Sequence, residues 1–202
     1  MNRAGPLDAY VLHQWDWSET SLIVDLFSRE AGRVAVAAKG AKRPTSHLRA
    51  VLLPFQRIAA SISRPRGDEA AEIFNLRAAE YSGGGAIVPA ARLMEGFYLN
   101  ELLLRLLARQ DPHPRLFDVY AETVHALADD DAIEGALRAF ELVLLRETGV
   151  LPDLGLGGVS QRPLSSGRRY AIRAEIGLVE PADGEDGIAA EACLALHAAL
   201  DH

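Results

Sequence analysis

Residues 21–39 read SLIVDLFSREAGRVAVAAK, and this stretch predicts a β-hairpin. Its first half, Ser21–Ser28, places Leu22, Val24 and Leu26 on one face and Ile23, Asp25 and Phe27 on the other, which is the alternation of a strand. The return strand is predicted over Arg33–Lys39. The connection Arg29–Gly32 ends in a glycine that can take the positive φ of a hairpin turn.

Three further strands are predicted around this hairpin. They cover Ala9–His13, Phe55–Ser63 and Glu72–Ala79, with turn residues at Pro65–Asp68 between the last two. The segment Gly40–His47 has no apolar period and is predicted to be a loop. Five short strands in the first 80 residues or so are typical of a small barrel, and an OB-type barrel has this size.

The pattern changes after Tyr81, where residues 82–85 read SGGG. We place a boundary there, between a domain of residues 1–81 and a second domain of residues 82–202. Apolar residues at helical spacing predict helices over Pro89–Arg109, Leu116–Leu127, Ala132–Thr148 and Ile188–Leu200. Residues 154–180 are predicted to be an irregular insert, with short strands between Arg168 and Val179. The predicted class is therefore α+β, a five-stranded OB-type β-barrel followed by a mainly helical domain.

Composition excludes several classes of protein. The chain has 202 residues, 49% of them hydrophobic, and a formal net charge of −7. It has neither an apolar run near the roughly 18 residues of a membrane helix nor an apolar signal segment at its start. The single cysteine, Cys193, excludes an internal disulfide and a cysteine-based zinc cluster. These features predict a globular protein of the reducing cytoplasm.

No pattern in the sequence predicts catalysis. The six histidines are scattered without metal-ligand spacing, and no glycine-rich stretch has the surroundings of a phosphate-binding loop. Cys193 is expected to be a buried, inert thiol. An enzyme acting on nucleic acid would need clustered acids for Mg²⁺ near its basic residues, and residues 29–66 contain only Glu30. We predict no catalytic residue, no cofactor and no metal.

The most informative feature is basic. Residues 29–66 hold nine lysines and arginines, in a chain that is acidic as a whole. Several cations on neighbouring strands and one loop can bind a phosphate backbone, whereas the alternative is a solvated face that only keeps the barrel soluble. Trp15 and Trp17 flank Asp16 in a predicted turn, where one of them can stack on a base, while Phe27 and Phe55 are expected in the core.

Seven segments, taken in order, resemble the bacterial RecO family of recombination mediators. They are VLH at 11–13, WSETSL at 17–22, SREAGR at 28–33, AKGAKR at 38–43, LPF at 53–55, GFYLNELL at 96–103 and LRAFEL at 137–142. The resemblance extends from about Tyr10 to Asp153. It implies an N-terminal OB-fold, a helical domain and no bond-breaking chemistry.

The resemblance also implies a function. Members of this family bind single- and double-stranded DNA, anneal complementary strands and, with RecR, help to load RecA on strands coated by SSB. The matching motifs make Arg33, Lys39, Lys42 and Arg43 the expected DNA contacts, with Arg29 and Arg49 in support. The competing interpretation is a scaffold whose barrel docks a protein partner and touches DNA only incidentally.

Three features of the helical part bear on the resemblance. Many RecO-like proteins carry a four-cysteine zinc module, but Leu154–Val179 contains no cysteine, so zinc is not expected. Arg138 stands beside an apolar stripe and can receive the acidic tail of SSB, or it can pair with Glu134 or Glu141 on its own helix. The chain ends at residue 202, earlier than family members usually do, so a final helix of the family is expected to be missing here.

Overall fold

The computed structural model describes residues 5–65, 67, 70–83, 87–128 and 132–201. Two compact units make up the chain, Met1–Phe140 and Glu141–His202. Residues 66 and 68, in the predicted turn, and residues 84 and 85, in the predicted domain break, lie outside this description. The division of the chain at residue 82 stays a prediction.

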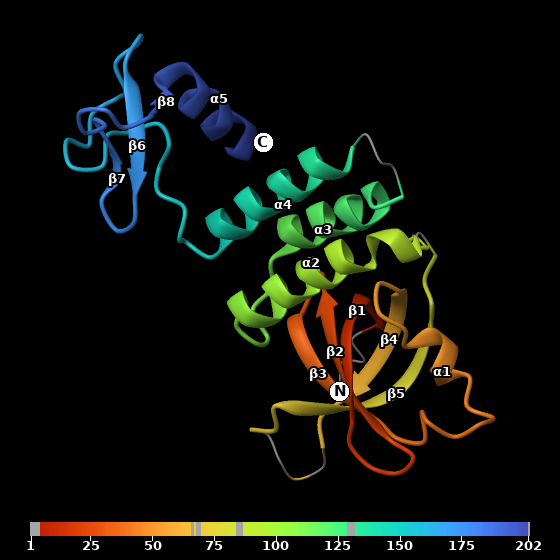
Figure 1. The fold of residues 1–202 in the computed structure, drawn as a ribbon. Coiled ribbons are helices and arrows are strands. Elements are labelled where there is room, and N and C mark those ends of the chain that lie inside the picture. Colours follow the sequence, from red (N-terminus) through yellow and green to blue (C-terminus); the bar gives the residue numbers. More distant parts are fainter. Residues whose placement is uncertain (1–4, 66, 68–69, 84–86, 129–131, 202) are drawn as a thin grey trace. The chain divides into compact units, whose positions relative to one another are not determined.

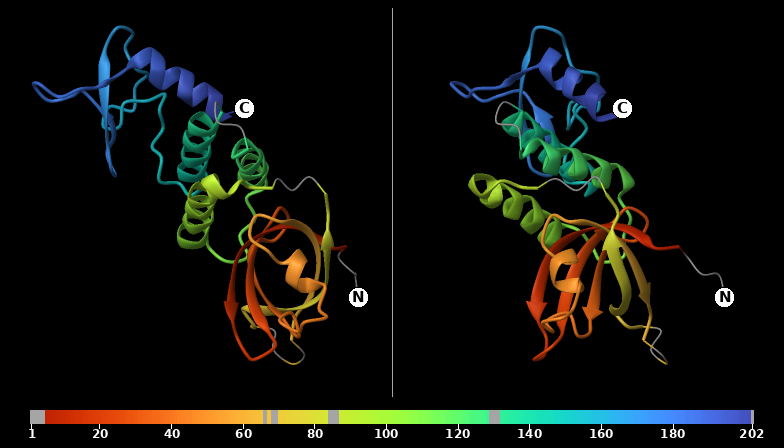
Figure 2. Two further views of the ribbon diagram at one scale, coloured as in Figure 1. Left: turned by 45° about the vertical axis from the view of Figure 1, so that its right-hand side comes forward. Right: turned by 90° about the vertical axis from the view of Figure 1, so that its right-hand side faces the viewer.

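Five strands of the first unit close into a barrel, as the sequence predicts (Figures 1 and 2). They are β1 (Leu7–Asp16), β2 (Leu22–Ser28), β3 (Gly32–Ala38), β4 (Arg57–Ser63) and β5 (Ile73–Tyr81). Their order around the barrel is β1-β2-β3-β5-β4, and all neighbours are antiparallel except β3 and β5, which run parallel. A short helix, α1 (Leu48–Val51), follows the predicted loop and buries Val51 in the barrel core.

Most residues on both faces of β2 are buried, whereas a barrel strand without a cover would expose its outer face to solvent. Leu22, Val24 and Leu26 point into the barrel, where they join its hydrophobic core. Phe27, on the opposite face, packs against Phe117 and Tyr120, with ring centroids 5.6 and 6.0 Å apart. These two aromatic residues belong to α3 (Pro114–Ala126), which therefore covers the outer face of the hairpin. Phe27 and Phe55 are both buried, as predicted.

The helices deviate from their predicted bounds for local reasons. The 3₁₀ helix η1 (Ala90–Arg92) leads into α2 (Leu93–Leu106), which stops before the predicted Arg109. The chain beyond α2 instead joins β3, because the Gln110 amide donates to the Arg33 carbonyl at 2.9 Å. Helix α3 starts at a proline, a position that the first turn of a helix tolerates because its N–H needs no partner there.

A bulge in β1 provides the attachment point for α2. Val11 pairs with Leu26 and His13 with Asp25, which leaves Leu12 without a partner on β2. The buried Asn100 side chain of α2 donates to the Leu12 carbonyl at 2.7 Å. Its carbonyl oxygen accepts a hydrogen bond of 2.6 Å from the Tyr120 hydroxyl of α3. One amide thereby ties a strand to two helices.

The second unit begins within α4 (Ile133–Glu147), which spans both units. Strands β6 (Arg169–Arg173), β7 (Gly177–Val179) and β8 (Ile188–Ala189) form a small sheet, followed by α5 (Ala190–Asp201). The predicted short strands and final helix are thus confirmed. Buried Leu154, Leu164, Tyr170 and Leu178 form its apolar centre.

The hairpin turn gives a first prediction, on stability. Gly32 has a φ of +65°, and an added Cβ would lie 2.0 Å from the Asp111 carbonyl oxygen. We expect Gly32→Ala to lower the free energy of unfolding by about 3 kcal/mol, from backbone strain and from displacement of the chain after α2. Gly83→Ala is the matched control, because Gly83 has a φ of +79° with nothing within 4 Å of the added atom. Urea unfolding followed by tryptophan fluorescence measures both, and equal losses would contradict a role for the Asp111 contact.

Candidate nucleic-acid interface

A groove of about 490 Å³ runs along the outer wall of the barrel. It crosses β2, β3 and β5 and is bordered by the β1–β2 turn and the β4–β5 loop. We call it the barrel groove, and its lining consists of Trp17, Ile23, Ala37, Lys39, Pro65, Ala71, Glu72, Ile73 and Asn75. This position, on strands 2 and 3 between the loops before β2 and before β5, is where OB-folds bind oligonucleotides.

The barrel groove combines an aromatic face with a cation. The Trp17 side chain is 55% exposed. Its turn is stabilised by a hydrogen bond of 3.1 Å from the Trp17 backbone N–H to the Ser21 carbonyl. Lys39 is exposed and forms no ion pair within the described part of the chain. Glu72, the acid of the lining, accepts a hydrogen bond of 3.1 Å from Arg109. Stacking on an indole ring beside an ammonium group is the chemistry that holds a single nucleic-acid strand.

Three more predicted DNA contacts lie in and after the segment that follows β3. Lys42 is half-buried, and its ammonium is 2.9 Å from an Asp16 carboxylate oxygen. Arg43 and Arg49 are exposed and form no ion pair with any described residue. Lys42 and Arg49 line a second hollow, of about 510 Å³, which we call the loop hollow. The structure thus brings Lys39, Lys42, Arg43 and Arg49 to the same end of the barrel.

Arg29 and Arg33 lie at the opposite end of β3, about 20 Å away along the strand. The Arg29 guanidinium binds both carboxylate oxygens of Asp118 on α3, at 3.0 and 2.9 Å, and this pairing lowers the pKa of Asp118. The Arg33 side chain is 15% exposed and donates to the carbonyl of Leu107, at the end of α2, at 3.0 Å. Both arginines hold helices against the barrel, and their contact with DNA stays a prediction.

A buried carboxylate lies beneath Arg33. Asp25 is 1% exposed, and its Oδ1 lies 3.6 Å from an Arg33 nitrogen. Burial raises the pKa of Asp25, and the positive charge of Arg33 opposes that rise.

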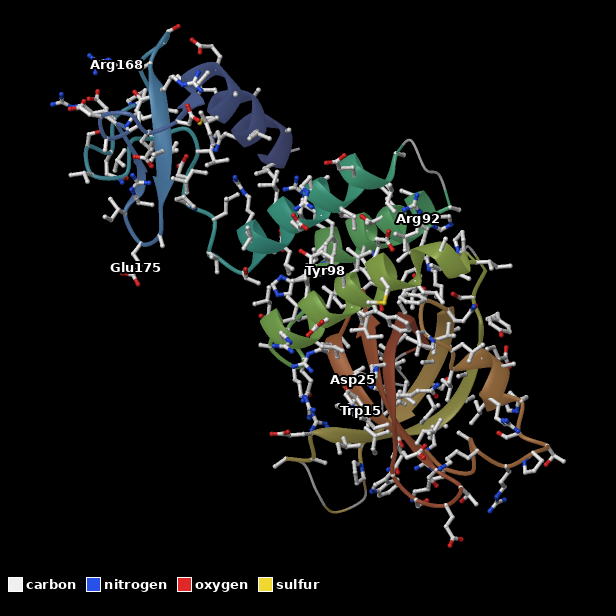
Figure 3. The ribbon with its side chains drawn as sticks, viewed as in Figure 1. Trp15, Asp25, Arg92, Tyr98, Arg168 and Glu175 are labelled. Carbon is white, nitrogen blue, oxygen red and sulfur yellow. The ribbon has the colours of Figure 1, made fainter. Side chains whose placement is uncertain are left out.

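Figure 3 shows Asp25 on the barrel beside Trp15. The Trp15 side chain is 44% exposed and packs edge-on against His13, with ring centroids 4.4 Å apart. Trp15 pairs with the groove residue Ile23 but does not line the barrel groove, whereas Trp17 does.

The groove residues of β5 were missed by sequence reasoning. Ile73 and Asn75 reach the barrel groove because β5 pairs in parallel with β3, through Ile73 with Ala35 and Asn75 with Ala37. Pairing between strands 35 residues or more apart leaves no local pattern in the sequence. The exposed isoleucine at the start of a strand was the available signal, and it is a weak one.

The remaining predicted residues are Arg138, at the end of the first unit, and Cys193 and residues 154–180, in the second. Arg138 is exposed on α4 and takes part in an interaction with its surroundings. Cys193 is buried, which raises its pKa. Residues 154–180 contain neither cysteine nor histidine, so the side chains present do not fit a zinc site of the family type. Within the described ranges, no group of three or more His, Cys, Asp or Glu residues is arranged to hold a metal ion.

Comparison with known proteins identifies both halves of the chain. Residues 6–80 match the family model described as "Recombination protein O N terminal", and residues 90–196 match "Recombination protein O C terminal". The "DNA repair protein RecO" of Delftia acidovorans is 54% identical over 182 residues, which are 89% of this chain and 71% of that protein. The protein of the same name from Variovorax paradoxus is 47% identical over 199 residues, 96% of this chain and 76% of that one. Among the described residues, no helix has the length and apolar character needed to cross a membrane.

Proposed function

Because the chain belongs to the RecO family of DNA repair proteins, we propose that its barrel groove binds single-stranded DNA and that the protein anneals complementary strands. The observation that carries this proposal is that the exposed Trp17 shares the lining with Lys39, which forms no ion pair with a described residue, on the wall where OB-folds bind oligonucleotides. The indole would stack on a base, and the ammonium would bind the adjacent phosphate.

The proposed role is electrostatic and involves no bond breaking. Two phosphate backbones repel each other, and cations placed between them reduce this repulsion so that bases can pair. Lys39, Lys42, Arg43 and Arg49 supply such cations from one end of the barrel. Annealing by this route needs no catalytic residue, cofactor or metal, and it suits double-stranded as well as single-stranded DNA.

Family membership supports the proposed partners. We propose that the protein works with RecR to help load RecA on SSB-coated strands, in the cytoplasm and at the nucleoid. For the acidic tail of SSB we propose Arg138 as a contact, because a guanidinium beside an apolar helix face suits a peptide that ends in carboxylates and apolar side chains.

One observation favours the second candidate, a scaffold that docks a protein. Helix α2 exposes several large apolar side chains, more than a solvated helix needs. They are Leu93, Met94, Phe97, Tyr98 and Leu106. In that case the protein would form a stable complex with a RecR-like protein and bind DNA only weakly by itself.

The two tryptophans provide the test. We expect Trp17→Ala to weaken binding of a fluorescently labelled oligothymidylate about tenfold, because one stacked base contributes about 1–3 kcal/mol. Trp15→Ala is the matched control, since Trp15 has similar exposure but packs on His13 and does not line the groove. Fluorescence anisotropy measures both affinities. Equal effects of the two substitutions would refute the proposed groove, and undetectable binding by the unmodified protein would favour the scaffold.

A further inference from the structure

The two hollows at the end of the barrel are separate surfaces. No residue lines both the barrel groove and the loop hollow, whose lining is Gln14, Asp16, Leu22, Ala41, Lys42, Arg49 and Leu53. Neighbours in the chain divide between them, as Leu22 lines one and Ile23 the other. Because consecutive strand residues point to opposite faces, the loop hollow lies at the mouth of the barrel and the groove on its outer wall.

The segment after β3 stands between these surfaces. Lys39 lines the barrel groove, and Lys42, three residues later, lines the loop hollow. The position of this segment is fixed by backbone hydrogen bonds, in which the Lys42 N–H donates to the Thr20 carbonyl at 3.0 Å and the Ala41 N–H to the Ala38 carbonyl at 3.4 Å. A single rigid turn therefore presents one ammonium group toward each hollow. In Figure 1 this turn lies at the end of the barrel away from α2 and α3.

The loop hollow has the chemistry of a phosphate site. Asp16 compensates Lys42, but Arg49 in the lining and Arg43, the residue after Lys42 in the chain, form no ion pair within the described chain. Leu53 is the large exposed apolar side chain of the lining, and no aromatic ring is part of it. Guanidinium groups that form no ion pair with any described residue, at a hollow without an aromatic ring, suit a backbone of phosphates better than a peptide with aromatic anchors.

We propose that the two hollows hold two DNA strands at once, one in the barrel groove and its complement in the loop hollow. This inference rests on the proposed function and adds a second strand site to it. The first strand is held through stacking on Trp17, and the second through its phosphates alone, which leaves its bases free to pair. Lys39 would then contact the first backbone and Lys42 the second, and both would reduce the repulsion between them.

Stoichiometry tests the inference directly. Oligothymidylate of about six nucleotides, short enough to fill one hollow, is titrated into the unmodified protein at low salt and counted by native mass spectrometry. We expect two oligonucleotides per chain. Arg43→Glu with Arg49→Glu should leave one, and Trp17→Ala with Lys39→Glu should also leave one. The control, Arg162→Glu with Arg169→Glu, makes the same change in charge at exposed positions of the second unit and should retain two.

Annealing of longer complementary strands gives an independent measurement. We expect the Arg43/Arg49 variant to anneal about tenfold more slowly while its affinity for one short strand falls less than about threefold. One oligonucleotide per unmodified chain, two on the Arg43/Arg49 variant, or an unchanged annealing rate in that variant would each overturn the second site alone. Displacement of the second oligonucleotide by an acidic peptide, without slower annealing, would reassign the loop hollow to a protein. No binding at all by the unmodified protein would overturn the proposed function as well.

Discussion

Charge reversal at Lys39, Lys42 and Arg43 together is expected to lower the affinity for single-stranded DNA at least about 100-fold at moderate salt. These residues lie in one short segment that reaches both the barrel groove and the loop hollow. Reversal replaces attraction to phosphate by repulsion at each position. A DNA strand bound in either hollow would therefore meet at least one reversed charge. Anisotropy titrations over a range of salt concentrations measure the effect.

The salt dependence gives the same experiment a second readout. For a single strand, the logarithm of the binding constant falls with the logarithm of salt by about 0.7 for each phosphate contact. The triple variant should therefore show a slope shallower by about 2, because about three contacts are lost. Arg162→Glu, Arg168→Glu and Arg169→Glu in the second unit form the control, with the same total change of charge. Salt-insensitive binding by the unmodified protein, or full affinity in the triple variant, would refute the electrostatic role.

The barrel could be predicted from local sequence because each of its strands carries its own pattern. Alternation and the glycine of the turn identified the hairpin, and Gly32 indeed takes a positive φ. Local patterns could not show which strands pair to close the barrel or where a strand is interrupted by a bulge. The parallel pairing of β3 with β5 and the bulge at Leu12 depend on closure of the barrel and on the helix that packs there.

The candidate site was harder to predict because charge counting gives no direction. Arg29 and Lys39 belong to the same basic segment, but they lie at opposite ends of β3. Arg29 meets Asp118, some 90 residues later in the chain, and Arg33 meets the end of α2. The basic segment therefore serves two purposes, since one end attaches the helices and the other remains open to solvent. Only the contacts of the folded chain separate them.

The GFYLNELL segment has a physical explanation in the same contacts. An added Cβ at Gly96 would lie 2.9 Å from the ring of Phe55, so the absence of a side chain there lets this buried ring approach α2. Asn100, one turn later, faces the bulge of β1 and binds the Leu12 carbonyl. Both residues face the barrel, which explains why a small residue and an amide occur on the buried side of this helix.

Asn100→Ala is expected to lower the free energy of unfolding by about 4 kcal/mol. The substitution leaves the Leu12 carbonyl and the Tyr120 hydroxyl, both buried, without their partner, and each unsatisfied group costs about 1–3 kcal/mol. Loss of the buried amide also leaves a small cavity, which adds to the cost. Because native domains are stable by only about 5–15 kcal/mol, such a loss is a large fraction of the total. Urea unfolding monitored by fluorescence of Trp15 and Trp17 measures it within the barrel.

A double-mutant cycle separates the network from simple packing. Tyr120→Phe removes only the hydroxyl, and it should cost about 1–2 kcal/mol by leaving the Asn100 carbonyl unpaired. The losses of the two single variants should add up to at least about 1 kcal/mol more than the loss measured for the double variant. The reason is that the shared hydrogen bond is lost only once in the double variant. Thr123→Val is the control, because this buried hydroxyl binds only the Val119 carbonyl within its own helix. Additive losses, or a Thr123→Val effect as large as that of Asn100→Ala, would show that Asn100 fills space on α2 and does not attach the helices to the bulge.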